Sequence, residues 1–286
     1  MLSTNVLRQF LHWLERRHKR VFLYILLIAY GLITLYPLLQ GVFTSFKSLN
    51  EIYQGALTPP STMHWHNYVE AWTRGGFGVC FWNTIIVTVL SVAGTIFFSS
   101  MAGYVLARHV FWGDNALLMY FLAGLMLPYR LAIIPLFVLL RDLRLLDNLF
   151  GLACAYIGSS IPFSVFIFSN YFRYLPKEIE EAAIIDGASV FRIYLQVLLP
   201  LVRPALATVA TVVFVWVWND VFLPLVLIQS PEKRTLMLGL NAFFGRYLNE
   251  WNLILAGANI TLIPVIFFYI FASRQFIEGL VLGARR

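Results

Sequence analysis

The chain has 286 residues, of which 60% are hydrophobic and 12% are charged. This composition is too apolar for a water-soluble globule of that length, so it predicts an integral membrane protein. The formal net charge of +7 does not indicate nucleic-acid binding, because the basic residues do not gather in one patch with interleaved aromatic residues. Attraction to an anionic inner leaflet explains the excess better.

The first segment, residues 1–20, is basic and amphipathic. Apolar residues recur there at helical spacing, opposite Arg8, His12 and Arg16, which predicts a cytoplasmic helix on the inner leaflet. The apolar run at about 21–46 then predicts the first membrane span. A cleaved signal peptide is the alternative, but the run is too long for a signal core and lacks a convincing cleavage site.

Residues 47–79 are more polar and predict an extramembrane loop. His64 and His66 have a spacing that could bind a metal on an extended strand, but the sequence shows no complete ligand set around them. Cys80 and Cys154 lie at the edge and in the middle of apolar segments, again without further ligands. We therefore expect neither a metal site nor a disulfide framework.

Further apolar segments, each long enough to cross a hydrocarbon core of about 30 Å, follow along the chain. They lie at about 80–107, 115–140, 148–172, 204–229 and 253–273. With the first span they predict an all-α membrane protein of six transmembrane helices, with one transmembrane domain over 21–286. Pro and Gly interrupt several spans, as is common where a polar pathway crosses the membrane.

The Lys and Arg residues predict the orientation. With the N-terminus in the cytoplasm, thirteen of them lie inside and seven outside, which the positive-inside rule favours. Both termini and the loop at 175–203 are then cytoplasmic.

The fifth predicted span contains a polar group, Trp216, Trp218, Asn219 and Asp220. A carboxylate within a membrane is unfavourable unless it faces water or a partner, so these residues are candidates for a substrate path, where the tryptophan rings could stack on the apolar faces of the substrate. Two alternatives remain open. Asp220 could instead pair with a basic group such as Arg130 or with a partner chain, and the tryptophans could form an interfacial belt.

The polar loop at 175–203 predicts two short helices. Pro176 suits a first helical position, and the acidic residues after it complement the helix start, which predicts a helix over roughly 176–186. Gly187 is placed to end that helix in a left-handed conformation, and Ser189 is placed to cap the next helix. Apolar side chains in this loop indicate a protein partner.

No phosphate-binding G-x-x-x-x-G-K-[ST] motif is present, because none of the four lysines follows a glycine. We expect no enzymatic activity and no cofactor on this chain. If the chain takes part in an ATP-driven process, the ATP and Mg must be bound by another chain.

The loop also resembles the EAA loop of ABC-importer permeases, in the succession Glu181-Ala182-Ala183, Asp186-Gly187-Ala188 and Leu199-Pro200. Beyond the loop, residues 60–286 resemble the second permease of carbohydrate ABC importers, which handle di- and oligosaccharides and glycerol phosphates. The matching pieces include Ala102-Gly103-Tyr104, Trp218-Asn219-Asp220 and Pro224-Leu225. The C-terminus, Leu282-Gly283-Ala284-Arg285-Arg286, departs from the family's usual tail.

This resemblance implies a type I importer permease fold in the plasma (inner) membrane of a prokaryote. It implies a complex with a second permease, an ATP-binding subunit dimer and an extracytoplasmic sugar-binding protein, the last facing the 230–252 loop. The residues expected to couple to the ATPase are Glu181, Ala182, Ala183, Asp186, Gly187, Ala188 and Pro200. The alternatives are an ABC permease for a non-sugar solute, an ion-coupled secondary transporter and a membrane anchor.

Overall fold

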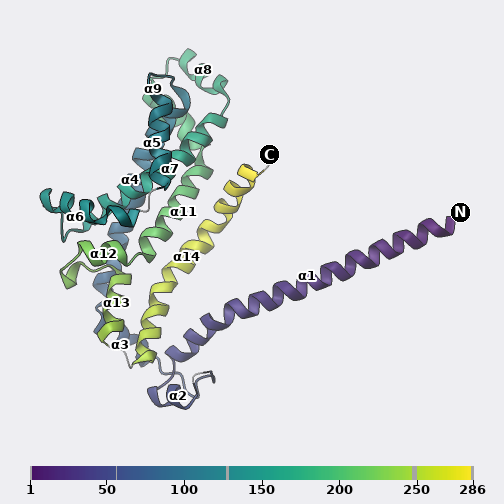
Figure 1. The fold of residues 1–286 in the computed structure, drawn as a ribbon, viewed down its shortest axis with the longest axis vertical. Coiled ribbons are helices and arrows are strands. Elements are labelled where there is room, and N and C mark those ends of the chain that lie inside the picture. The colour runs from purple at the N-terminus through teal and green to yellow at the C-terminus, as the bar shows by residue number, and fades with distance from the viewer. Residues whose placement is uncertain (1, 56, 127–128, 247–249, 285–286) are drawn as a thin grey trace. The chain divides into compact units, whose positions relative to one another are not determined.

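The computed structural model describes residues 2–55, 57–126, 129–246 and 250–284, and all regular structure in these residues is helical (Figure 1). The chain divides into two compact units, described one at a time. One comprises residues 1–69 and 247–259, and the other comprises residues 70–246 and 260–286.

The first unit is dominated by α1, Leu2–Ser45. Its part Arg20–Ser45 is long and apolar enough to cross a membrane, which agrees with the expected first span, and the N-terminal segment continues into it as one uninterrupted helix. The short α2, Leu49–Gln54, begins at a capping box in which Ser48 and Glu51 cap each other's backbone N–H groups.

The core of the second unit is formed by three helices that lie side by side (Figure 1). They are α4 (Phe77–Arg108), α7 (Leu149–Tyr174) and α11 (Arg203–Asn219). The backbones of α4 and α7 approach closely at Gly103, where a Cβ atom would lie 2.6 Å from Cβ of Phe168 and 2.9 Å from the backbone nitrogen of Ser169. Small residues permit this approach where helices pack inside a membrane.

Two of the expected spans are not single helices. The segment 115–140 forms α5 (Asp114–Met126), a short 3-10 turn η1 (Tyr129–Ala132) and α6 (Ile133–Asp142), with an angle of 90° between the two arms. The segment 204–229 is divided because α11 ends at Asn219 and α12 covers only Phe222–Leu227. Hydropathy alone could not predict these breaks, since residues on both sides of each are apolar.

The number of spans agrees with six when the bent pairs are counted. In the part of the chain that the structure describes, four helices are long and apolar enough to cross a membrane. Two bent pairs, Asp114–Met126 with Arg130–Asp142 and Val190–Leu201 with Arg203–Asn219, bring the number to six if each is one span. The second pair begins within the expected 175–203 loop. The last span lies in α14, Trp251–Ala284. This helix is longer than the expected span 253–273.

The bundle of the second unit carries connecting segments at its two ends (Figure 1). At one end lie α8 (Lys177–Ile185) and α9 (Val190–Arg192). At the other lie α12, a 3-10 turn η3 (Pro231–Lys233) and α13 (Leu236–Arg246).

The segment before α13 is held by the side chain of Asp147, which lies more than eighty residues earlier in the chain. Asp147 Oδ1 accepts hydrogen bonds from the backbone N–H groups of Gln229 and Ser230, both at 3.0 Å, and Lys233 Nζ lies 3.1 Å from Asp147 Oδ2. The Ser230 hydroxyl, which also donates to this carboxylate, is the main cause that holds the pKa of Asp147 below its usual range. The hydrogen bonds to Asp147 therefore fix the conformation of residues 229–233.

Candidate functional site

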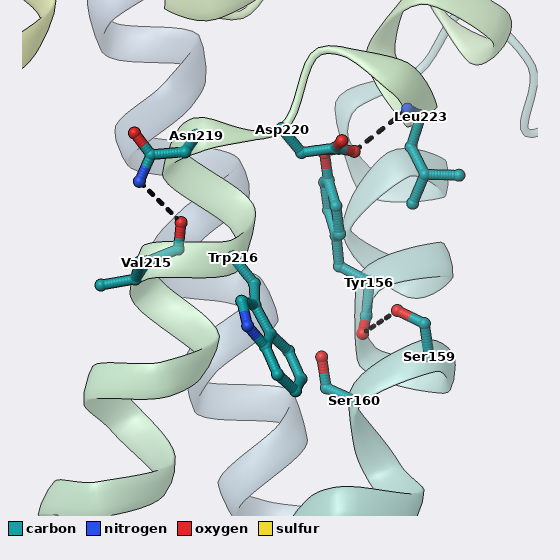
Figure 2. A pocket seen from close by; sticks show the side chains of 8 residues that line it. All are labelled: Tyr156, Ser159, Ser160, Val215, Trp216, Asn219, Asp220 and Leu223. Atoms are coloured by element: carbon teal, nitrogen blue, oxygen red, sulfur yellow. Dashed lines mark hydrogen bonds between the residues drawn. The ribbon is translucent and has the colours of Figure 1, made fainter. Parts of the chain in front are cut away.

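A pocket of about 490 Å³ opens between α7 and α11, within the size range of small-molecule sites (Figure 2). Trp216 is its largest side chain, 49% exposed, and its indole points toward Ser160 across the pocket. The lining consists of Tyr156, Ser159 and Ser160 from α7, Val215, Trp216 and Asn219 from α11, and Asp220 and Leu223 beyond it. The pocket thus combines one broad aromatic face with hydroxyl, amide and carboxylate groups.

Asp220 lies at the break between α11 and α12, not within a helix. Its carboxylate accepts hydrogen bonds from the backbone N–H groups of Phe222 (3.1 Å) and Leu223 (3.0 Å), and from the Tyr156 hydroxyl (2.9 Å). Asp220 therefore caps the start of α12 and joins it to α7. The Arg130 guanidinium, its suggested alternative partner, lies over the Phe222 ring, 5.3 Å from the centroid.

The two tryptophans of α11 have different surroundings, because residues two apart point to nearly opposite sides of a helix. Trp218 is 3% exposed, its indole N–H donates to the Thr261 carbonyl at 3.3 Å, and its ring stacks on Phe214. Of the four predicted path residues, Trp216, Asn219 and Asp220 line the pocket. Trp218 is buried on another side of α11 and does not line this pocket, so the structure does not bring it together with the other three.

Sequence reasoning missed the α7 side of the pocket. Tyr156, Ser159 and Ser160 share one helix face, at positions i, i+3 and i+4. Three hydroxyl residues on one face of an apolar span form a pattern that could have revealed them.

The 175–203 loop begins with α8, Lys177–Ile185, close to the expected 176–186. Pro176 is the residue before the helix and not its first member. Gly187 has φ +77°, and its N–H donates to the Ile184 carbonyl at 2.9 Å, while the Ala188 N–H donates to the Ala183 carbonyl at 3.0 Å. This is a Schellman ending with glycine in the left-handed position, as predicted.

The second arm of the loop is compound. Ser189 stands at the N-cap of α9, but its side chain makes no capping hydrogen bond. After α9 the chain forms a π-helical segment, η2 (Ile193–Leu198), and then α10 (Leu199–Leu201), which contains the half-buried Pro200. π-helical turns occur frequently at functional sites.

The residues expected to contact a partner divide into two groups. Glu181, Ala182, Asp186 and Gly187 are exposed, whereas Ala183 and Ala188 pack against the protein's own core. Large apolar side chains are also exposed here, with Ile185 at 85% and Phe191 at 59%. Large exposed apolar side chains on a loop favour a protein interaction site.

Comparisons with known proteins identify the family. Residues 96–277 match the family described as the binding-protein-dependent transport system inner membrane component. The chain is 35% identical over 263 residues to the diacetylchitobiose uptake system permease protein NgcG of Streptomyces coelicolor, covering 91% of this chain and 87% of that one. It is 33% identical over 281 residues to the arabinooligosaccharides transport system permease protein AraQ of Halalkalibacterium halodurans, covering 94% and 99%.

A solved structure agrees in fold. It is the crystal structure of a bacterial ABC transporter involved in the import of the acidic polysaccharide alginate, one chain of which is 27% identical with a TM-score of 0.81, covering 91% of this chain and 97% of that one. The match, together with the apolar helices, indicates a multi-pass membrane protein with the fold of a type I ABC-importer permease. The chain belongs to the family of inner-membrane components of binding-protein-dependent transport systems.

Proposed function

We propose that this chain is the permease subunit of an ATP-driven importer of neutral saccharides, and that the pocket between α7 and α11 lies on the substrate path. The observation that carries the proposal is the lining itself. Trp216 offers an exposed aromatic face to the apolar side of a sugar ring, while Ser159, Ser160 and Asn219 can bond its hydroxyls.

The charge of the lining favours a neutral ligand. Of the eight lining residues, Asp220 is the only charged one, and its oxygens already accept the three hydrogen bonds described above. An anionic sugar would meet a negative carboxylate without a compensating cation in the lining, which is unfavourable where water is scarce. This speaks against uronates and glycerol phosphates, although one structural relative serves the acidic polysaccharide alginate.

The remaining parts of the proposal follow the family. This chain pairs with a second permease, two ATP-binding subunits bind ATP and Mg, and an extracytoplasmic binding protein delivers the sugar to the 230–252 side. The exposed residues of the 175–203 loop contact the ATPase. Both termini and that loop face the cytoplasm, in the inner membrane of a prokaryote.

The test is uptake into proteoliposomes that contain the complete complex, with binding protein outside and ATP inside. We expect ATP-dependent uptake of a neutral di- or oligosaccharide, and none of a uronate oligosaccharide or of glycerol phosphate. Uptake of a non-sugar solute alone would contradict the saccharide assignment. Uptake driven by an ion gradient without ATP would favour a secondary transporter.

Replacing Trp216 tests the pocket directly. We expect Trp216→Leu to reduce saccharide uptake about five- to tenfold, because stacking on an aromatic face contributes about 1–1.4 kcal/mol. The matched control is Trp82→Leu, which removes an exposed indole on α4 that does not line the pocket. Equal uptake by both variants would exclude Trp216 from the path.

A further inference from the structure

Two neighbouring glutamates of α8 point in different directions. Glu181 is exposed, whereas the side chain of Glu180 is 16% exposed and turns toward the interior with Ile179 and Ala183, which pack against the core. Of these two glutamates, the family resemblance gives a role only to Glu181. Glu180 needs a separate explanation, because a carboxylate that is largely removed from water is retained only with good partners.

The partners of Glu180 lie at the end of the transmembrane helix α4. The Tyr104 hydroxyl donates to Glu180 Oε1 at 2.8 Å, and Arg108 Nε lies 3.4 Å from Glu180 Oε2. That second contact is ionic, since Arg108 Nε makes no hydrogen bond. The Arg108 side chain is 3% exposed, and its Nη2 donates to the Leu175 carbonyl at 2.8 Å, in the link that leads into α8.

The second arm of the loop is fastened to the same helix. The hydroxyls of Tyr194, in η2, and Ser100, in α4, form a buried hydrogen bond of 2.7 Å. The Tyr194 ring also packs on the Tyr104 ring, with centroids 5.5 Å apart. Both arms of the loop are therefore attached to one transmembrane helix through Tyr104, Arg108 and Ser100.

We propose that Glu180, Arg108 and Tyr104 are positioning residues that transmit the movement of α8, when the ATPase pair closes, to the transmembrane helix α4. A short exposed helix joined to a span only by flexible chain could move without moving the span. The buried ion pair and the Tyr104 hydrogen bond prevent that, because moving α8 away from α4 would leave buried charges unpaired. Glu181 contacts the ATPase, and Glu180 holds the span.

The test measures how much solute is transported for each ATP hydrolysed by the reconstituted complex. Glu180→Gln is nearly isosteric and leaves an acceptor for Tyr104, but it removes the charge that faces Arg108. We expect the ratio of uptake to hydrolysis to fall about tenfold, within the usual range of coupling between distant sites. The ATPase subunit should still copurify in normal amount, because the exposed residues of the loop are unchanged.

The matched control is Glu178→Gln. Glu178 also lies in the first turn of α8 but is exposed, so both variants lose the same interaction with the helix dipole and only one loses the buried pair. We expect Glu178→Gln to keep the wild-type ratio. A purely structural role of Glu180 would instead lower the amount of assembled complex and leave the ratio unchanged, which would overturn the proposal.

A second variant tests the proposal if the Glu180→Gln chain does not assemble into the complex. Tyr104→Phe keeps the ring contacts and removes only the hydroxyl that donates to Glu180, and we expect a smaller fall in the same ratio. A wild-type ratio in Tyr104→Phe would then overturn the proposal. The inference rests on the proposed function for the contact of the loop with the ATPase and for the choice of solute. If the wild-type complex imports a different solute, the saccharide assignment fails, while the ratio measured with that solute still tests Glu180.

Discussion

Gly187 ends α8 in a backbone conformation that residues with a β-carbon avoid. At φ +77° a side chain would be strained by its own backbone, although a Cβ atom built there meets no other atom within 4 Å. The requirement is therefore conformational and not steric. Asn, which enters the left-handed region more readily than other non-glycine residues, should be the best replacement.

We expect Gly187→Val to lose uptake or weaken assembly with the ATPase while membrane insertion stays normal, because β-branched residues are least compatible with this conformation. Gly187→Asn, the control with a side chain of similar bulk, should retain most of the uptake. Proteoliposome uptake, with the amount of inserted protein measured by immunoblot, checks both. Full uptake by Gly187→Val would show that the turn does not need its present geometry.

The conformation of Gly187 could be predicted from the sequence, whereas the residues that line the pocket from α7 could not. The left-handed Gly187 follows from its own neighbours, because a helix ending involves only a few consecutive residues. The pocket residues Tyr156 and Ser159 lie about sixty positions from Asp220, and only the packing of α7 against α11 brings them together. The different surroundings of Trp216 and Trp218 depend likewise on which side of α11 is covered.

Helix α4 packs closely against α7 in the second unit. Its contact with α7 at Gly103 leaves no room for a methyl group, since the nearest atoms include the α7 backbone at Ser169. Backbone atoms cannot move aside as the end of a flexible side chain can. The proximity of α4 and α7 thus depends on a single hydrogen atom in place of a side chain.

We expect Gly103→Ala to lower the free energy of unfolding by about 1–3 kcal/mol, as for other overpacked cores. The control is Gly158→Ala in α7, where a Cβ atom meets nothing within 4 Å, so only the better helix propensity of alanine acts. Thermal unfolding of the purified proteins in detergent compares the two. A midpoint for Gly103→Ala at or above that of the wild type would contradict the packing seen here.

Helices were predictable where a long apolar run has polar residues at both of its ends. The spans 80–107 and 148–172 correspond to α4 and α7 within a few residues. The division of the run at 204–229 was not predicted, although Asp220 three residues before Leu223 and four before Pro224 has the spacing of a helix cap. The hydrogen bonds that Asp220 accepts from the N–H groups of Phe222 and Leu223 show that it caps α12.

At the scale of the whole molecule, the proposed orientation depends largely on charge near the N-terminus. Residues 8–20 hold five of the thirteen basic residues placed on the cytoplasmic side, and such residues near a first span strongly influence topology. This orientation assigns the α8 end of the second unit to the cytoplasm and the η3 end to the outside.

Labelling of single cysteines by an impermeant maleimide checks this orientation. In a background with Cys80 and Cys154 replaced, Glu232→Cys should react in intact spheroplasts, and Ile185→Cys only after permeabilisation. Both positions are exposed in the structure of this chain, so with the chain expressed without its ATPase a failure to react reports the compartment and not burial. The reverse pattern would invert the topology and remove α8 from the reach of a cytoplasmic ATPase.

The opposite orientations of Glu180 and Glu181 bear on how such transporters diversify. The residues that would meet the ATPase and the residues that hold α8 to α4 are separate sets on one short helix. Substitutions that adapt the outer set to a different ATPase can therefore accumulate without disturbing the inner set. A permease built in this way can exchange its energy-supplying subunit, or share one with other permeases, while the attachment of the loop to its own spans stays the same.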